Sequence, residues 1–208
     1  KELVVSNLLA SDILDHHSNF SQKYSEIKLT GSRPTLAFVT PWNSHGYTVA
    51  KLVAKKFTFA SPVWFYIKPP AGTSAGEYRI QGEHDIDADW VKELQSRGVR
   101  GIFLRLSNPV PVTPRFAISE FEHADFMAII QGPQSALDSL AAQIKYLVVK
   151  HQFDGAVLEI SVPKYLHALV STVSQAFQKD ALTLVLVIGP ARGNEQMDFG
   201  AKGIHSFS

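Results

Sequence analysis

The sequence predicts an α/β fold built around a parallel β-sheet. Five short apolar runs recur along the chain, and each is continuous rather than alternating, as in a parallel sheet covered by helices. The segments between them carry apolar residues at helical spacing, which indicates βα units in either a doubly wound sheet or a (β/α)8 barrel. The predicted strands cover residues 35–40, 60–67, 100–106, 153–160 and 182–188.

The helical pattern is clearest over residues 135–150, where Leu137, Leu140 and Ile144 recur at a period of 3.6. A second helix is predicted over residues 87–97, with Asp87 as its N-cap. Prolines and glycines predict a loop at residues 69–76, and three prolines exclude regular structure from residues 108–116. The remaining predicted helices cover residues 46–57, 119–130 and 166–177.

The first 33 residues differ from the rest in being polar and irregular, with only a hint of a short helix at residues 8–14. We therefore divide the chain into an N-terminal segment, residues 1–33, and a barrel-like domain, residues 34–208. Asn19 begins the sequence Asn-Phe-Ser, an N-glycosylation sequon, and is the candidate glycosylation site.

Composition excludes several classes of function. The net charge is +1 over 208 residues, so no overall basic field favours nucleic acid. The chain has no cysteine, hence no disulfide framework and no cysteine-ligated zinc, and no apolar run is long enough to predict membrane insertion. Neither the dinucleotide fingerprint nor a phosphate loop is present, so we expect no cofactor and no metal. Because the chain starts at Lys1, we expect either a removed targeting segment or a non-native N-terminus.

Candidate site residues are those near the carboxyl ends of the predicted strands, where parallel α/β folds bind ligands. Trp42 follows the first strand, Trp64 and Tyr66 lie near the end of the second, and Asp154 and Glu159 lie on the fourth. Aromatic rings with a few carboxylates suit a saccharide, although either tryptophan could equally cap the core. A carboxylate inside an apolar strand, such as Glu159, needs polar partners.

The fourth predicted strand resembles glycoside hydrolase family 18, the chitinases. Its sequence FDGAVLEIS aligns with the family signature Asp-Gly-x-Asp-x-Asp-x-Glu, with Asp154 and Gly155 at the opening pair. Val157 stands at the second Asp, Glu159 at the third, and Ser161 at the catalytic Glu. The family Glu protonates the glycosidic oxygen, a step for which a serine hydroxyl is far too weak an acid. The resemblance therefore implies a chain without catalytic residues.

Four further strings resemble the stabilin-interacting, chitinase-like branch of this family: residues 39–47 (VTPWNSHGY), 56–58 (KFT), 61–64 (SPVW) and 84–87 (HDID). That branch also lacks the catalytic acid. The resemblance covers roughly residues 35–195 and implies a TIM (β/α)8 barrel of the family 18 chitinase type. Residues 107–113 depart from the branch as an insertion. Only five strands precede the end of the pattern, so we expect a barrel truncated after about five βα units, since the complete fold has eight.

The resemblance implies a non-catalytic protein that binds chitooligosaccharide, with lipopolysaccharide as a second ligand. It also implies a scavenger receptor of the stabilin type as a partner, and a secreted or lysosomal location. Two alternatives stay open. One is a residual glycoside hydrolase in which Glu159 serves as the acid, and the other is a truncated product with only a protein-interaction role.

Overall fold

A five-stranded sheet with the order β4-β3-β5-β6-β7 forms the centre of the molecule. The computed structural model describes residues 6–19, 31, 33–70, 77–96, 110–160 and 166–188. Strands β3, β5, β6 and β7 run parallel, and β4 pairs antiparallel with β3 at one edge. A separate parallel pair, β1 and β2, is linked to this sheet by a bridge between Ala60 and Val112. The strands are β1 (Leu36–Val39), β2 (Phe59–Pro62), β3 (Phe65–Lys68), β4 (Arg79–Gln81), β5 (Arg115–Ile118), β6 (Gly155–Ile160) and β7 (Thr183–Ile188).

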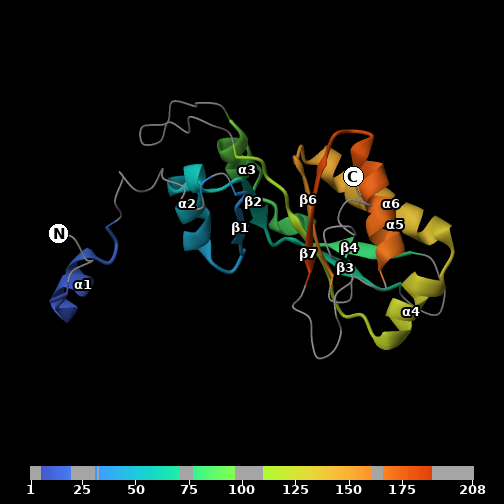
Figure 1. The fold of residues 1–208 in the computed structure, drawn as a ribbon, viewed down its shortest axis with the longest axis horizontal. Coiled ribbons are helices and arrows are strands. Elements are labelled where there is room, and N and C mark those ends of the chain that lie inside the picture. The colour runs from blue at the N-terminus through green and yellow to red at the C-terminus, as the bar shows by residue number, and fades with distance from the viewer. Residues whose placement is uncertain are drawn as a thin grey trace.

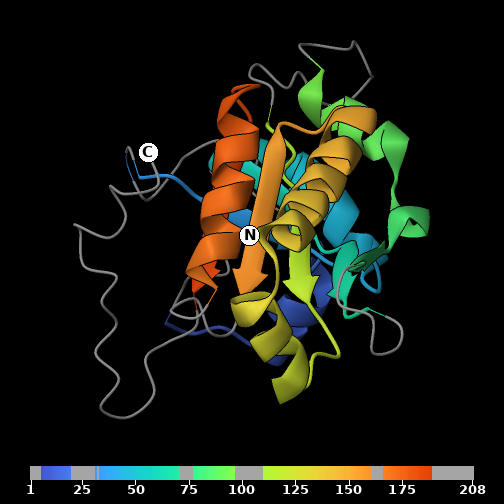
Figure 2. The same ribbon diagram turned by 90° about the vertical axis from the view of Figure 1, so that its right-hand side faces the viewer.

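Helices α5 and α6 lie side by side against one face of the five-stranded sheet (Figures 1 and 2). Helix α1 buries no residue and lies apart from the other elements (Figure 1). None of the helices within the described ranges is long and apolar enough to cross a membrane. The helices are α1 (Ala10–His16), α2 (Ser44–Leu52), α3 (Ala88–Gln95), α4 (His123–Gln131), α5 (Gln134–Lys150) and α6 (His167–Gln178), with 3-10 turns η1 (Ala54–Lys56) and η2 (Glu83–Asp85).

Side chains alternate along the strands and divide the sheet into two faces. On β6, Ala156, Leu158 and Ile160 belong to the hydrophobic core that includes the inward residues of α5 and α6. Across β3 and β5, Phe65 and Phe116 stack on the same side with ring centroids 4.5 Å apart. The alternate positions form what we call the second face: Tyr66, Lys68, Arg79, Gln81, Arg115, Ala117, Val157, Glu159, Val185 and Val187.

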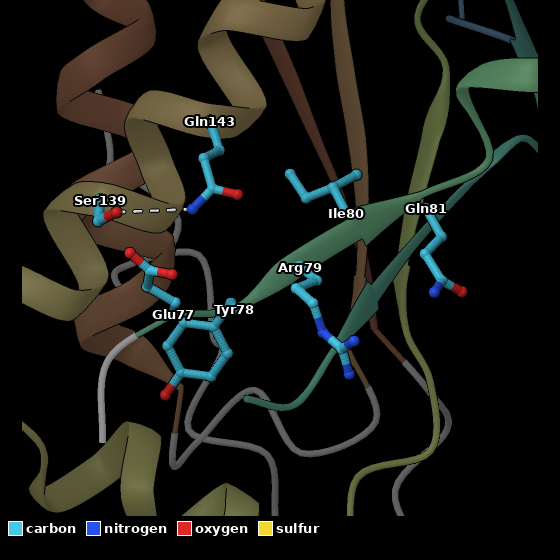
Figure 3. A pocket seen from close by; sticks show the side chains of 7 residues that line it. All are labelled: Glu77, Tyr78, Arg79, Ile80, Gln81, Ser139 and Gln143. Carbon is cyan, nitrogen blue, oxygen red and sulfur yellow. Dashed lines mark hydrogen bonds between the residues drawn. The ribbon is translucent and has the colours of Figure 1, made fainter. Parts of the chain in front are cut away.

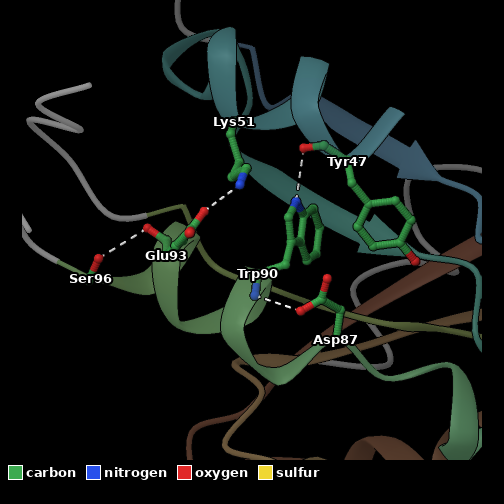
Figure 4. A network of polar contacts seen from close by, with 6 residues as sticks. All are labelled: Tyr47, Lys51, Asp87, Trp90, Glu93 and Ser96. Atoms are coloured by element: carbon green, nitrogen blue, oxygen red, sulfur yellow. Dashed lines mark hydrogen bonds and ion pairs between the residues drawn. The ribbon is translucent and has the colours of Figure 1, made fainter. Parts of the chain in front are cut away.

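Most predicted elements are present with shifts of a few residues at their ends. The Asp87 carboxylate accepts a hydrogen bond from the Trp90 backbone N–H at 2.9 Å, which confirms it as the N-cap of α3 (Figure 4). Helix α3 is held to α2 by an ion pair between Lys51 and Glu93 at 2.6 Å, while the Ser96 hydroxyl donates to the Glu93 carbonyl (Figure 4). Strands β1, β6 and β7 and helices α5 and α6 lie where the pattern predicts them.

Three predictions about the strands need correction or fall outside the structure. The single strand predicted over residues 60–67 is two strands, β2 and β3, because the extended structure is interrupted at Val63 and Trp64. Regular structure inside residues 108–116 was excluded wrongly, since β5 begins at Arg115. The last proline of that segment, Pro114, immediately precedes β5, where a missing N–H is tolerated. The strand predicted at residues 100–106 lies outside the described residues.

Two further elements differ from the pattern. Edge strand β4 was not predicted, because three residues carry too little periodicity. The helix predicted over residues 119–130 begins only at His123. Its first predicted residue, Ser119, instead continues the β5 ladder by donating its backbone N–H to Ile67 at 3.0 Å.

Gly155 marks a close approach between β6 and β7. A Cβ at this position would lie 1.9 Å from the backbone carbonyl oxygen of Thr183, which cannot move without disturbing β7. At Gly46, in α2, an added Cβ would find its nearest atom at 3.6 Å, an ordinary contact. The two glycines therefore respond to the same substitution in opposite ways.

We predict that Gly155→Ala lowers the free energy of unfolding by about 1–3 kcal/mol, through overpacking against Thr183. Gly46→Ala, the matched control, should be neutral or stabilise by about 0.5–1 kcal/mol, because alanine reduces the entropy of the unfolded chain. Urea denaturation of the variants measures both values. A Gly155→Ala protein as stable as the parent would contradict the close approach.

The amino end of β6 is preceded by an ion-pair cluster that joins η2 to the end of α5. The Lys150 ammonium donates to the Glu83 carboxylate, and the His151 ring nitrogen Nε2 lies 2.7 Å from the same oxygen. The hydrogen bond from Lys150, followed by that from His151, lowers the pKa of Glu83 below its ordinary value of 4.5. The same pairing raises the pKa of Lys150.

A lowered carboxyl pKa contributes stability above the unfolded value, and this stability is lost as pH falls through the folded pKa. We therefore predict that Glu83→Gln has a lower melting temperature than the parent at pH 7. The difference should be small, because the pair is half exposed, and it should shrink as pH falls below about 4.5. Melting curves between pH 7 and pH 3 test this, with Glu77→Gln as the control; a gap independent of pH would contradict it.

Candidate functional site

Trp64 lies in an aromatic cluster in the core, not on the surface. Its side chain is 0% exposed, and its indole N–H donates to the Tyr47 hydroxyl at 2.8 Å. The rings of Trp90 and Phe153 lie 6.1 Å and 5.9 Å from it. Trp90 in turn donates its indole N–H to the Tyr47 carbonyl at 3.0 Å (Figure 4). The prediction that Trp64 stacks on a saccharide is therefore corrected, because no surface of its ring is free.

The same burial affects Tyr47, the polar partner within this cluster. Burial raises the pKa of the Tyr47 hydroxyl above its ordinary value of 10, and the hydrogen bond from Trp64 opposes this rise. The hydroxyl therefore serves as a neutral acceptor that satisfies a buried indole. Trp64 lies between β2 and β3, so its hydrogen bond to Tyr47 holds the chain in place where the strand is interrupted.

Asp154 lies at the amino end of β6, the end opposite to the predicted site. Its carboxylate accepts hydrogen bonds from the Val112 backbone N–H and the Gln95 amide, each at 2.7 Å. Glu159 is five residues further along, or about 16 Å at the rise of an extended strand. The assignment of Asp154 to the saccharide site is therefore corrected. Its carboxylate ties β6 to α3 and to the segment before β5.

Glu159 lies on the second face, one residue before the end of β6. Its carboxylate pairs with the guanidinium Nε of Arg115 on the neighbouring strand β5. The side chains are 38% and 19% exposed, so both groups are partly removed from water. The polar partner that the sequence required of Glu159 is thus Arg115, which offsets the carboxylate charge and fixes its orientation.

Tyr66 and Glu159 lie in one row across the second face. The strand register pairs Tyr66 with Ala117, and Ala117 with Glu159. Two strand spacings separate the tyrosine from the glutamate, or about 10 Å. The row continues to Gln81 on β4 and Val187 on β7. The structure therefore brings together two of the five predicted site residues.

Trp42 follows the carboxyl end of β1 and is 72% exposed. Its neighbour Asn43 caps α2 by accepting a hydrogen bond from the Gly46 N–H at 3.2 Å. Strand β2 pairs parallel with β1, with Val39 opposite Pro62, so the carboxyl end of β1 lies beside the interruption between β2 and β3 and not beside the carboxyl end of β3. Within the described part of the chain, no hydrogen bond or ring contact joins Trp42 to Tyr66 or Glu159.

Four charged residues on or beside the second face were missed by the sequence analysis. Lys68 pairs with Glu120, and its ammonium lies 3.4 Å from the Ser119 hydroxyl and 6.0 Å from the centre of the Tyr66 ring. Arg115 and Arg79 also belong to the second face. The sequence signal that could have identified them is a charged residue inside or just after a short apolar strand. It was missed because β4 and β5 were not predicted as strands.

Asn19, the candidate glycosylation site, is exposed just after α1. Its amide nitrogen lies 3.2 Å from the ring nitrogen Nδ1 of His16. The other two sequon residues lie outside the described residues, so glycosylation stays a prediction.

A cavity of about 510 Å³ lies between β4 and α5, on the helix side of the sheet (Figure 3). None of the predicted site residues lines it. Its walls are polar, with the Gln143 amide 3.5 Å from the Ser139 hydroxyl (Figure 3). The lining residues are Glu77, Tyr78, Arg79, Ile80, Gln81, Ser139 and Gln143.

Comparison with solved structures shows a fold of the chitinase type. A chitinase from Chromobacterium violaceum ATCC 12472 matches with a TM-score of 0.54 at 12% sequence identity, covering 74% of this chain and 45% of that one. The GH18 chitinase ChiB from the chitin utilization locus of Flavobacterium johnsoniae matches with a TM-score of 0.54 at 12% identity, covering 84% and 51%. The chain thus spans about half the length of either neighbour. No protein-family model matches the chain.

We predict that Arg115 and Glu159 are energetically coupled. Arg115→Met leaves the carboxylate partly buried without its partner, so it should destabilise more than the double variant Arg115→Met/Glu159→Gln. The coupling energy should be about 1 kcal/mol, between the values typical of exposed and buried pairs. Urea denaturation of the four proteins in the double-mutant cycle measures it, and a coupling near zero would contradict the pairing.

Proposed function

We propose that the chain is a non-catalytic, chitinase-like protein that binds saccharides on the second face of its sheet. The observation that carries this proposal is the sequence of β6 and the residue after it. The sequence positions that carry acids in catalytic members of family 18 are Val157, Glu159 and Ser161 here, of which Ser161 lies outside the described residues. No residue of this series supplies a carboxylic acid at the position that would protonate a glycosidic oxygen.

The packing around β6 supports the proposal. Val157 is 0% exposed, so its place offers neither a polar group nor access to a ligand. Glu159 is engaged by Arg115, and this pair is suited to hold sugar hydroxyls through its remaining donors and lone pairs. Tyr66, in the same row, offers a half-buried ring for the apolar face of a sugar.

The fold supports the further inference that these strands are part of a (β/α)8 barrel. Strands β3, β5, β6 and β7 are parallel neighbours in sequence order, as in such a barrel. The neighbouring structures are chitinases, although at 12% identity they inform on the fold alone. Strand ends at the carboxyl edge carry the ligand sites of barrels, and Glu159 lies near that edge of β6.

A secreted or lysosomal location and a stabilin-type receptor partner belong to the same proposal. They rest on the sequence resemblance described above and not on any contact in the structure. A pull-down with a receptor ectodomain that is insensitive to competing sugar would favour the protein-interaction role over the saccharide-binding one.

The proposal predicts that chitotetraose raises the melting temperature of the 208-residue chain, because a ligand of the native state stabilises it by mass action. Tyr66→Ala should weaken binding about threefold to tenfold, the usual value of a lost aromatic contact. Tyr146→Ala removes a ring that is 62% exposed on α5 and should leave affinity unchanged. A well-folded chain that binds no chitooligosaccharide overturns the proposal.

The residual-hydrolase alternative is tested in parallel. We expect no turnover of a fluorogenic N-acetylglucosamine substrate by the parent chain. Turnover that disappears in Glu159→Gln would instead assign the acid role to Glu159.

A further inference from the structure

Two cations lie directly opposite one another on the second face. The β3–β4 register pairs Lys68 with Arg79. Their sequence neighbours Ile67 and Ile80 are also paired and pack toward the hydrophobic core, so strand alternation puts both cations on the other side. Like charges directly opposite in an antiparallel pair are destabilising. An anion bound between Lys68 and Arg79 would offset this repulsion.

Lys68 is the more deeply placed of the two cations. Its side chain is 12% exposed, and its ammonium lies within reach of the Ser119 hydroxyl and above the Tyr66 ring. The counter-charge comes from Glu120, which follows the end of β5. A lysine with so little contact to water needs such a partner.

Glu120 is a partner that a ligand can replace. The Glu120 side chain is 73% exposed, against 12% for the lysine that it neutralises. Water around the carboxylate screens its attraction to the ammonium, so the ion pair adds little stability. The Glu120 backbone has φ at +62°, a conformation that non-glycine residues rarely adopt. The pair of Arg115 and Glu159 differs, because both of its members are partly withdrawn from water.

Arg79 is exposed, and within the described ranges it takes part in no ion pair. Figure 3 shows its side chain on the side of β4 opposite to Ile80, which points toward Gln143. Glu77, two positions earlier, lies on the α5 side in the same view. Among the described residues, Glu120 is thus the one exposed carboxylate that pairs with either of the two cations at this corner of the second face.

We infer that Lys68, Arg79 and Ser119 form a subsite for the carboxylate of an acidic saccharide. This inference rests on the proposed saccharide-binding function and names its ligand class. The planar guanidinium of Arg79 matches a carboxylate through two parallel hydrogen bonds, and the ligand carboxylate takes the place of Glu120 on Lys68. Tyr66, beneath the lysine, supplies a ring surface for the apolar face of the sugar that carries the carboxylate.

The test compares three tetrasaccharides by isothermal titration on the full 208-residue chain. They are chitotetraose, a hyaluronan tetrasaccharide in which glucuronate alternates with N-acetylglucosamine, and the methyl ester of the latter, which keeps its shape and loses its charge. The hyaluronan tetrasaccharide should bind at least about tenfold more tightly than its ester at low salt, as one hydrogen-bonded charge pair implies. Its advantage should shrink as salt rises.

Variants separate the subsite from a general role in folding. Arg79→Gln and Lys68→Met should each weaken the acidic ligand about tenfold to hundredfold and weaken chitotetraose much less. Lys68→Arg should retain most of the acidic affinity. Glu120→Gln should strengthen it, because the competing carboxylate is removed. The matched control is Lys145→Met, since Lys145 pairs with Asp180 on the helix side and should affect neither ligand.

The outcomes distinguish this inference from the function on which it rests. Preference for the acidic ligand that depends on Arg79 and Lys68 supports the subsite. Chitotetraose binding with no preference for the acidic ligand over its ester overturns the subsite and leaves the proposed function standing. Equal loss of both ligands in Arg79→Gln also overturns the subsite. A folded chain that binds none of the three overturns both.

Discussion

Strand β6 has to satisfy two different environments at once, and the remainder of the structure depends on how it does so. One set of its side chains fills the core beneath α5 and α6, and the alternate set includes a carboxylate. Gly155 lets the strand begin in close contact with Thr183 of β7, and Asp154 ties that beginning to α3. A shift of β6 by one residue would turn Glu159 into the core, so the register is fixed by burial on one face.

Charge on the second face is arranged in pairs across neighbouring strands. Arg115 offsets Glu159 between β5 and β6, and Glu120 offsets Lys68 between the end of β5 and β3. Arg79 adds a cation to the second of these pairs. Carboxylates engaged in this way are held in a fixed orientation, which accords with the proposed binding role. The polarity of this face thus comes from partners on separate strands.

Much of the fold could be predicted from local pattern. Apolar runs located β1, β6 and β7, and 3.6-residue periodicity located α5 and α6, because these elements each bury a continuous face. The pattern failed where elements are short or interrupted. Edge strand β4 has three residues, and β5 begins directly after a proline-rich stretch. The break between β2 and β3 depends on Trp64 entering an aromatic cluster with partners distant in sequence.

The candidate site was only partly predictable, and the reason is the same. From sequence alone, Glu159 was identified as a carboxylate that needs a partner, and Tyr66 as an aromatic residue near a strand end. Aromatic character cannot distinguish the buried Trp64 from the exposed Trp42, since both uses are favourable for a large ring. Motif alignment likewise cannot tell that Asp154 and Glu159 lie at opposite ends of β6 and contact different partners, Val112 for Asp154 and Arg115 for Glu159.

By itself, then, the sequence determined the α/β class, the principal strands and helices, and the absence of an acid at position 161. These follow from local periodicity and residue chemistry, which do not require knowledge of distant contacts. The tertiary structure alone decided that Arg115 is the partner of Glu159, that Trp64 belongs to the core, and that Lys68 faces Arg79. Such pairings depend on strand order and register, and those are set by the collective burial of one face of the sheet beneath its helices.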